Sequence, residues 1–149
     1  MSKWALTEVK KALVSSGFEL YRARGNEVSV ADRVRDNLIM ESGVSVVCDE
    51  STLAVRMVVR AQRSDFPGDS VPALFERARS LASAAEQRGF REVSTLTRTV
   101  QDPVDPSRTL DTWYEVAFEK TATELAAAMT EVRFALGMEK TARTEAPAT

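Results

Sequence analysis

The triplet Ser16-Gly17-Phe18 follows a helical pattern of apolar residues and precedes an alternating strand pattern. The same arrangement recurs at Arg88-Gly89-Phe90. A glycine just past a helix can adopt the left-handed conformation that ends it, and the phenylalanine can pack back onto the last turn. The two triplets therefore predict two helix-to-strand transitions in one chain.

Around the first triplet, the pattern predicts a helix followed by a meander of strands. Leu6, Val9 and Leu13 recur at helical spacing, and Gly25-Asn26 is a tight-turn dipeptide between two strand patterns. Residues 33–37 carry no clear pattern. The expected strands are 18–21, a return strand carrying Val28 and Val30, 38–40, 44–48 and 53–60, with turns at 41–43 and 49–51.

The stretch 53–60 shows the clearest strand alternation in the chain. Apolar residues occupy every second position, and arginines project from the opposite face. The apolar positions are Leu53, Val55, Met57 and Val59, and the arginines are Arg56 and Arg60. This alternation predicts a sheet with one buried face and one face open to solvent or to a partner.

The second half of the chain predicts a helix, a hairpin and another helix. Asp69 or Ser70 is the expected N-cap of the first of these helices, with Pro72 in its first turn. Its apolar stripe is Leu74, Ala78, Leu81 and Ala85, and Gly89 ends it. Strands 90–100 and 110–120 flank the loop 101–108, and Thr121-Ala122-Thr123-Glu124 has the spacing of a capping box that opens the last helix.

These elements predict an α+β fold with an antiparallel sheet of five to six strands and helices on one face, in the order α-β-β-β(-β)-α-β-β-α. Residues 1–140 form a single domain in this interpretation, and the polar residues 141–149 form a disordered tail. In element order, length and acidity the chain resembles the type III secretion chaperone-like fold, which includes the class I secretion chaperones and the YbjN family of bacterial regulators. The resemblance covers residues 3–140. It implies a cytoplasmic, often dimeric protein that binds another polypeptide.

Composition argues against several classes of function. The chain has no histidine, a single cysteine and no nucleophile, phosphate-loop or metal-ligand motif, so we expect no enzyme activity, no metal and no cofactor. A net charge of −2 without a basic cluster argues against nucleic acid as a partner. No stretch has the apolar length of a membrane span or the pattern of a signal peptide, so we expect a cytoplasmic protein with no membrane partner. Arginines outnumber lysines fifteen to five, which suits a GC-rich bacterial genome.

Two places stand out as candidate interfaces. On the last helix, Ala127, Phe134 and Met138 lie opposite the expected buried stripe of Leu125, Met129, Val132 and Leu136. Trp113 is expected to face outward from its strand, where exposed tryptophans are enriched in binding hot spots. The competing interpretations are that Phe134 packs under a neighbouring segment and that a cross-strand partner covers Trp113.

Acidic residues around the hairpin loop, Asp102, Asp105 and Asp111, could ligate a hard cation, but their spacing is wrong for an EF-hand and typical of turns. The sequence therefore predicts a non-catalytic module, favoured as a homodimer, that binds a polypeptide through apolar helix and sheet surfaces. The alternatives are a regulatory domain that senses a small ligand and, less favoured, an enzyme that depends on carboxylates.

Overall fold

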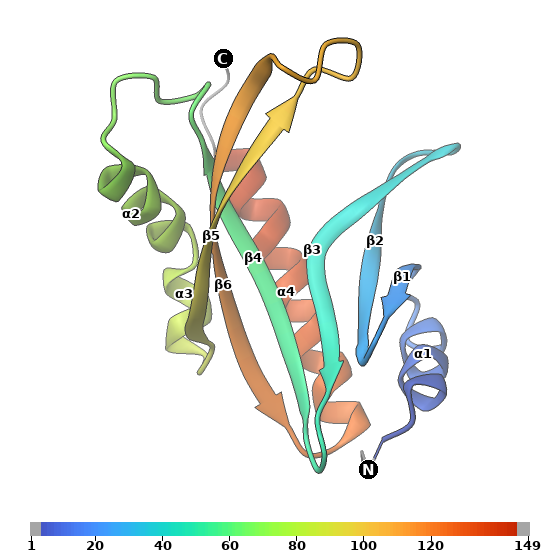
Figure 1. Ribbon diagram of the computed structural model, residues 1–149. Coiled ribbons are helices and arrows are strands. Elements are labelled where there is room, and N and C mark those ends of the chain that lie inside the picture. Colours follow the sequence, from blue (N-terminus) through green and yellow to red (C-terminus); the bar gives the residue numbers. More distant parts are fainter. Residues whose placement is uncertain (1–3, 146–149) are drawn as a thin grey trace.

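A six-stranded antiparallel sheet and four helices form the protein in the computed structural model, which describes residues 4–145 (Figure 1). The strand order is β1-β2-β3-β4-β6-β5, and every neighbouring pair is antiparallel. This confirms the predicted α+β class and the antiparallel sheet. The elements are α1 (Leu6–Ser15), β1 (Leu20–Arg24), β2 (Glu27–Arg35), β3 (Leu38–Cys48), β4 (Leu53–Gln62), α2 (Val71–Leu81), α3 (Ser83–Gln87), β5 (Arg91–Gln101), β6 (Thr109–Ala122) and α4 (Leu125–Glu145).

Both glycine-phenylalanine triplets end their helices as predicted. Gly17 has φ 91° and Gly89 has φ 107°. After each glycine, the phenylalanine N–H donates a hydrogen bond back into the last turn, from Phe18 to the Leu13 carbonyl and from Phe90 to the Ala85 carbonyl, each at 3.0 Å. The glycine N–H groups bond to Val14 and Glu86, which completes the Schellman pattern at both sites.

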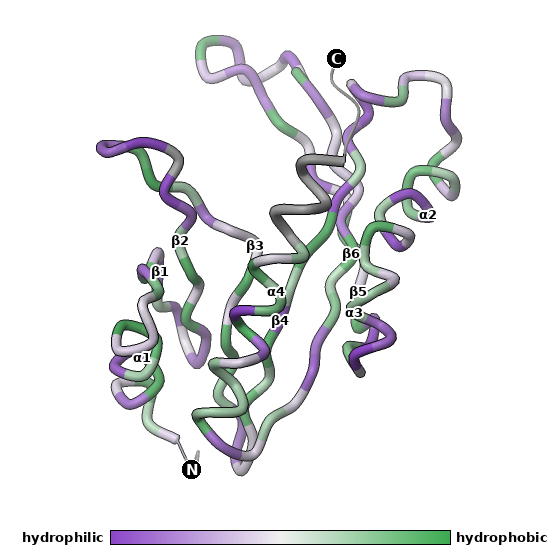
Figure 2. The backbone as a smooth tube through the Cα atoms, turned by 180° about the vertical axis from the view of Figure 1, so that it is seen from behind, coloured by the Kyte–Doolittle hydropathy of each residue, from purple (hydrophilic) through white to green (hydrophobic). Residues whose placement is uncertain are grey.

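The core lies between the sheet and its helices. The predicted alternation of side chains along β4 is confirmed. Its apolar side chains are buried and its arginines lie on the other face: the former are Leu53, Val55, Met57 and Val59, and the latter are Arg56 and Arg60. α4 crosses behind the middle strands and packs against β3, β4 and β6, with α1 on one side of it and α3 on the other (Figures 1 and 2). The helix layer therefore covers one face of the sheet and leaves the arginine-bearing face open.

The expected turn at residues 41–43 is wrong. β3 runs without interruption from Leu38 to Cys48, and the reversal of direction comes before it, at Asp36-Asn37. Gly43 instead has φ 90° within the strand, and the register with β2 shifts between Ser29 and Ala31. The buried Ser42 hydroxyl donates to the Val30 carbonyl at 2.7 Å and accepts from the Val44 N–H at 3.1 Å. Glycine and serine therefore form a β-bulge that bends β3, where the sequence pattern suggested a loop.

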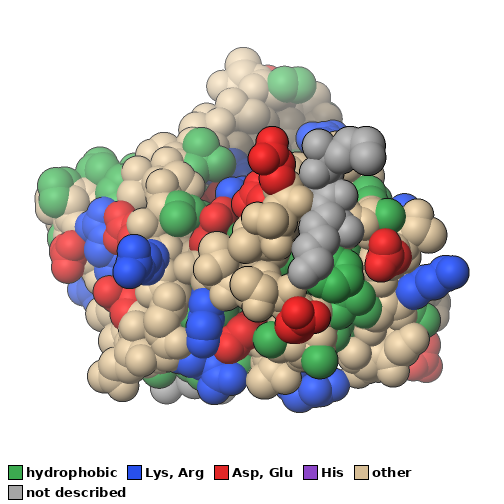
Figure 3. All heavy atoms as spheres, turned by 90° about the horizontal axis from the view of Figure 1, so that it is seen from below, with side chains coloured by type: hydrophobic (Ala, Val, Ile, Leu, Met, Phe, Trp, Pro, Cys, Tyr) green, Lys and Arg blue, Asp and Glu red, His purple; other side chains and the backbone are tan. Residues whose placement is uncertain are grey.

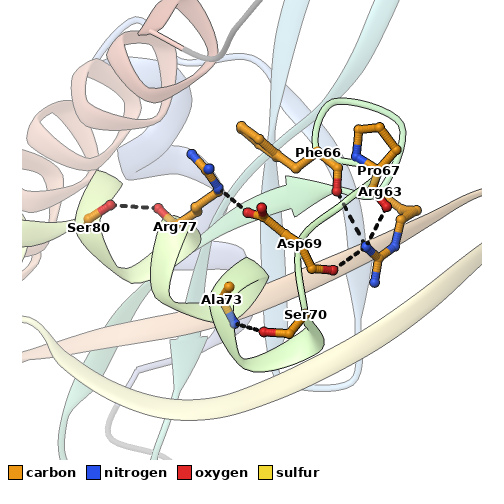
Figure 4. A network of polar contacts seen from close by, with 8 residues as sticks. All are labelled: Arg63, Phe66, Pro67, Asp69, Ser70, Ala73, Arg77 and Ser80. Atoms are coloured by element: carbon orange, nitrogen blue, oxygen red, sulfur yellow. Dashed lines mark hydrogen bonds and ion pairs between the residues drawn. The ribbon is translucent and has the colours of Figure 1, made fainter.

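The helix predicted to end at Gly89 is two helices. α2 ends at Leu81, and the short α3 begins at Ser83 after Ala82, whose φ is −103°. At the start of α2, the Ser70 hydroxyl accepts a hydrogen bond from the Ala73 N–H at 3.3 Å, which confirms the predicted cap. Figure 4 shows the loop before it, where Arg63 donates to the carbonyls of Phe66, Pro67 and Asp69. The Nη1 group of Arg63 thus lies within reach of three loop carbonyls, with its closest contact to that of Asp69 just before α2.

The last helix is longer than predicted and its buried stripe differs. α4 continues past Lys140 to Glu145, so it includes residues 141–145 of the stretch predicted as a disordered tail. Residues 146–149 lie outside the described residues. Its fully buried apolar side chains include Ala128, Val132 and Ala135, whereas Leu125 and Leu136 are only half-buried. Ala128 and Ala135 are thus among the residues that α4 buries where it packs against the middle strands.

A carboxylate on α4 ties the helix layer to the sheet. Glu131 is 7 % exposed and accepts hydrogen bonds from Arg88 Nε at 2.5 Å and from Lys120 Nζ at 2.8 Å. Lys120 Nζ also donates to the Arg88 carbonyl at 2.8 Å. Burial raises the pKa of Glu131, but the hydrogen bonds and positive charges of Arg88 and Lys120 outweigh it and hold the pKa below its ordinary value of 4.5.

Replacing Gly89 by alanine is expected to destabilise the protein by about 1 kcal/mol, because a Cβ disfavours the positive φ that ends α3. The nearest atom to such a Cβ is the flexible Lys120 Cε at 3.5 Å, so backbone strain and not a clash is the cause. Urea denaturation measures the change. Gly68→Ala, at an open site without positive φ, is the control and should leave the midpoint nearly unchanged.

Glu131→Gln is expected to lower the free energy of unfolding at neutral pH by about 1–3 kcal/mol, since two cationic donors lose their ionic acceptor. The folded pKa lies below the unfolded one, so the contribution is complete above about pH 5 and disappears as pH falls through the folded value. Denaturation curves at several pH values should show the difference between wild type and variant shrinking on acidification. A difference that grew on acidification would contradict this assignment. The control is Glu86→Gln, at an exposed position, which should leave the free energy of unfolding nearly unchanged.

Candidate functional site on the open face of the sheet

The open face of the sheet holds a groove of about 480 Å³. The pairing of β3 with β4 runs from Val44↔Met57 to Cys48↔Leu53. The outer half of β3, residues 38–43, separates from β4 beyond the Gly43 bulge. Figure 1 shows β3 curving away from β4 while β5 and β6 continue on the other side. The groove forms where the sheet divides, and its lining comes from β1, β2, β3, β4, β5 and β6.

The floor of the groove carries charged side chains that are paired within the chain. Arg56 Nε donates to Glu119 Oε2 at 2.7 Å, and Arg56 Nη1 lies 4.0 Å from Glu27 Oε2. The Ser45 hydroxyl donates to the same Glu27 oxygen at 2.5 Å. The open-face arginine predicted to project from β4 therefore has carboxylate neighbours from two other strands, as cross-strand pairing favours.

A second cluster centres on Glu115 of β6. Its side chain is 7 % exposed and lies between two guanidinium groups, Arg98 Nε at 3.2 Å and Arg60 Nη2 at 3.7 Å. A carboxylate this deeply placed needs such partners, because an unpaired buried charge is strongly unfavourable. Glu115 thus links Arg60 of β4 and Arg98 of β5 across β6, the strand that lies between them.

Trp113 lies in the groove beside this cluster. Arg60 stacks over its ring with Cζ 4.1 Å from the centroid, and its Nε1 donates to Asp111 Oδ2 at 3.2 Å. The predicted outward direction of Trp113 agrees with this position, and the cross-strand neighbour that covers the indole is an arginine. Asp111 is held in turn by the Ser64 N–H at 3.0 Å and the Ser64 hydroxyl at 2.8 Å, so it orients the indole.

Exposed apolar side chains form the walls of the groove. Ile39 and Met40 line it from β3, with exposures of 39 % and 51 %, and Leu96 lines it from β5 at 52 %. Tyr21 of β1 adds a partly exposed ring. Sequence reasoning missed these residues. The available signal was Leu96, a leucine between Ser94 and Arg98 on an otherwise polar strand face.

The structure places the three predicted α4 interface residues, Ala127, Phe134 and Met138, away from the groove. Phe134 stacks on Phe90 of its own chain at 5.8 Å between ring centroids, and Arg88 lies over its ring at 4.5 Å. Met138 also packs against the core, while Ala127 is exposed. α4 is apolar on more than one side because it lies between α1 and α3 within the helix layer, which the sequence pattern could not show.

The acidic residues of the β5–β6 loop have structural partners. Asp102 accepts from the Val104 N–H at 2.8 Å, and Asp105 accepts from the Ser107 N–H at 3.3 Å, as in ordinary Asx turns. Among the side chains that the structure describes, no group of three or more histidine, cysteine or acidic residues could hold a metal ion. No helix within the described part of the chain is long and apolar enough to cross a membrane.

Comparison with known proteins gives no further guide to the site. No protein-family model, curated protein or solved structure matches the chain. A function for the groove must therefore be argued from its own geometry.

The hydrogen bond between Trp113 and Asp111 is expected to make indole emission depend on pH. Burial raises the pKa of Asp111, but hydrogen bonds from the Ser64 hydroxyl and N–H, the Thr112 N–H and the indole hold it below its ordinary value of 3.8. In a Trp4→Phe background, the emission of Trp113 should stay constant down to about pH 4 and change only below 3.8. Asp111→Asn should remove that transition, and circular dichroism separates it from unfolding. A transition centred above pH 4 would contradict the assignment.

Proposed function

We propose that this protein is a non-catalytic binding module that takes a segment of another polypeptide into the groove on the open face of its sheet. The observation that carries the proposal is the combination of exposed apolar walls with a floor whose charges are paired. Burial of the exposed apolar side chains Ile39, Met40 and Leu96 by a bound segment would be favourable. Arg56 and Glu115 already have ion-pair partners within the chain.

The energetics suit a moderate interaction. Fully burying an aliphatic side chain contributes about 1.5–3 kcal/mol, and these side chains have roughly half of their surface left to bury. The ordering of a flexible segment opposes this gain. A floor that keeps its ion pairs avoids the desolvation of unpaired charges, so it can lie beneath a bound segment at small cost.

The resemblance to the type III secretion chaperone-like fold agrees with this proposal, because proteins of that fold bind other polypeptides. A cytoplasmic, bacterial homodimer with a chaperone-like or YbjN-like regulatory role belongs to the same proposal. Its dimer interface is not assigned to Phe134 and Met138, which pack within the chain.

The charge distribution and the paired carboxylates favour neither nucleic-acid binding nor catalysis. Acidic and basic side chains lie close together on the face seen in Figure 3, whereas a phosphate backbone requires a concentrated basic surface. In the groove, Glu115 is engaged by two arginines and Glu27 by Ser45, which favours a structural role for both carboxylates.

One observation favours the small-ligand alternative. The groove volume of about 480 Å³ falls within the roughly 300–1,000 Å³ typical of small-molecule sites. A regulatory ligand with a flat apolar part could lie between Met40 and Leu96. Thermal-shift screening with metabolites would reveal it as a rise in melting temperature that Met40→Asp removes.

For the polypeptide-binding proposal, Met40→Asp is expected to abolish the capture of a partner from a lysate of the source organism, because it places a charge on the apolar wall. Leu38→Asp is the matched control, since Leu38 lies on the same strand with similar exposure but does not line the groove. Mass spectrometry of the captured proteins, followed by titration with the purified partner, measures the difference. A partner retained equally by both variants would show that it binds elsewhere.

A further inference from the structure

The groove contains a strand edge inside the sheet. β4 pairs with β6 along its whole length, from Leu53↔Ala122 to Gln62↔Trp113. On its other side, the register with β3 ends at Met57. Within the part of the chain that the structure describes, residues 58–62 therefore have a strand neighbour on one side only, although β4 is a central strand.

In an antiparallel ladder, alternate residues direct their backbone N–H and C=O groups to opposite neighbours. About half of these groups in residues 58–62 consequently point toward the separated half of β3. Such a row of backbone groups is a template for another extended chain. The groove lies at this edge, since Val58 and Arg60 line it together with Ile39, Met40 and Glu41 across the division.

We propose that the bound segment lies as an added strand along residues 58–62 of β4, in the division between β3 and β4. This inference rests on the proposed function, since it specifies how a polypeptide would occupy the groove. The occupant is an extended segment of another protein, because only a backbone supplies donors and acceptors at the repeat that the β4 edge presents.

The side chains around the edge fit an alternating segment. In a strand, successive side chains point to opposite faces, so every second residue of the segment faces the groove. There it meets the apolar Met40 and Ile39 on one side and Arg60, stacked on Trp113, on the other. A length of five residues, about 16 Å at ~3.3 Å per residue, matches the stretch 58–62.

Alternate N-methylation tests the geometry directly. Heptapeptides are selected from a random phage-displayed library against the full chain and kept if Met40→Asp, but not Leu38→Asp, removes binding. Each selected peptide is then synthesised with N-methyl groups on its odd or on its even residues, and fluorescence anisotropy measures affinity. In an added strand, one set of N–H groups bonds to β4 and the other does not.

We expect one methylation pattern to weaken binding at least tenfold and the other to change it less than threefold. Hydrogen exchange of the complex should also show slower exchange of amides within residues 58–62, with little change in β5. Peptides that need Met40 but tolerate both methylation patterns equally would overturn the added strand and leave the binding function standing. A selection that yields no peptide dependent on Met40 would count against both.

A second copy of the chain is the remaining occupant to distinguish. Sedimentation equilibrium of the wild type, of Met40→Asp and of the peptide complex separates the cases. A dimer that Met40→Asp dissociates and that excludes the peptide would assign the β4 edge to self-association and overturn the proposal. The proposal is supported if one peptide binds per chain and the oligomeric state of the protein stays the same.

Discussion

The pairing of β4 with β6 is the interaction on which the other parts of the structure depend. Its register continues from Leu53↔Ala122 to Gln62↔Trp113 without a shift. On the covered face it aligns Met57 with Phe118 and Val59 with Val116, all of them buried. On the open face the same register sets Arg56 opposite Glu119 and Arg60 opposite Glu115. One set of backbone bonds thus aligns the core and the groove together, because side chains alternate between the faces with a period of two.

The groove follows from what happens on either side of this pair. β6 brings β5 alongside, while the bulge at Ser42-Gly43 turns β3 away from β4. A flat sheet with the same side chains would bring Met40 and Ile39 toward the arginine row and close the division. The bend in β3 therefore separates an apolar wall from a charged floor, and the binding surface depends on backbone geometry as much as on the side chains that line it.

The sequence predicted the parts of the fold that local chemistry determines. The Schellman ends at Gly17 and Gly89, the alternation of β4 and the cap at Ser70 each depend on residues close in sequence, and each is present. The bulge in β3 was missed because glycine after serine is typical of turns as well, and only pairing with β2 distinguishes the two. The groove was not predicted because its walls come from β3 and β5, which meet only through the tertiary fold. The stacking partner of Phe134 was not predicted for a related reason, since helical spacing does not reveal that Phe90 lies beside α4.

The position of β6 between β4 and β5 also has a consequence for synthesis of the chain. The first four strands can form consecutive hairpins as they leave the ribosome, but the partner of β4 on its other side lies at residues 113–122. Until that segment emerges, β4 has an exposed hydrophobic face and edge, and α4, which covers that face, is made later still. Contacts between segments so distant in sequence form slowly because loop closure opposes them. The nascent N-terminal half is therefore the stage at which this protein is most exposed to aggregation or to capture by cellular chaperones.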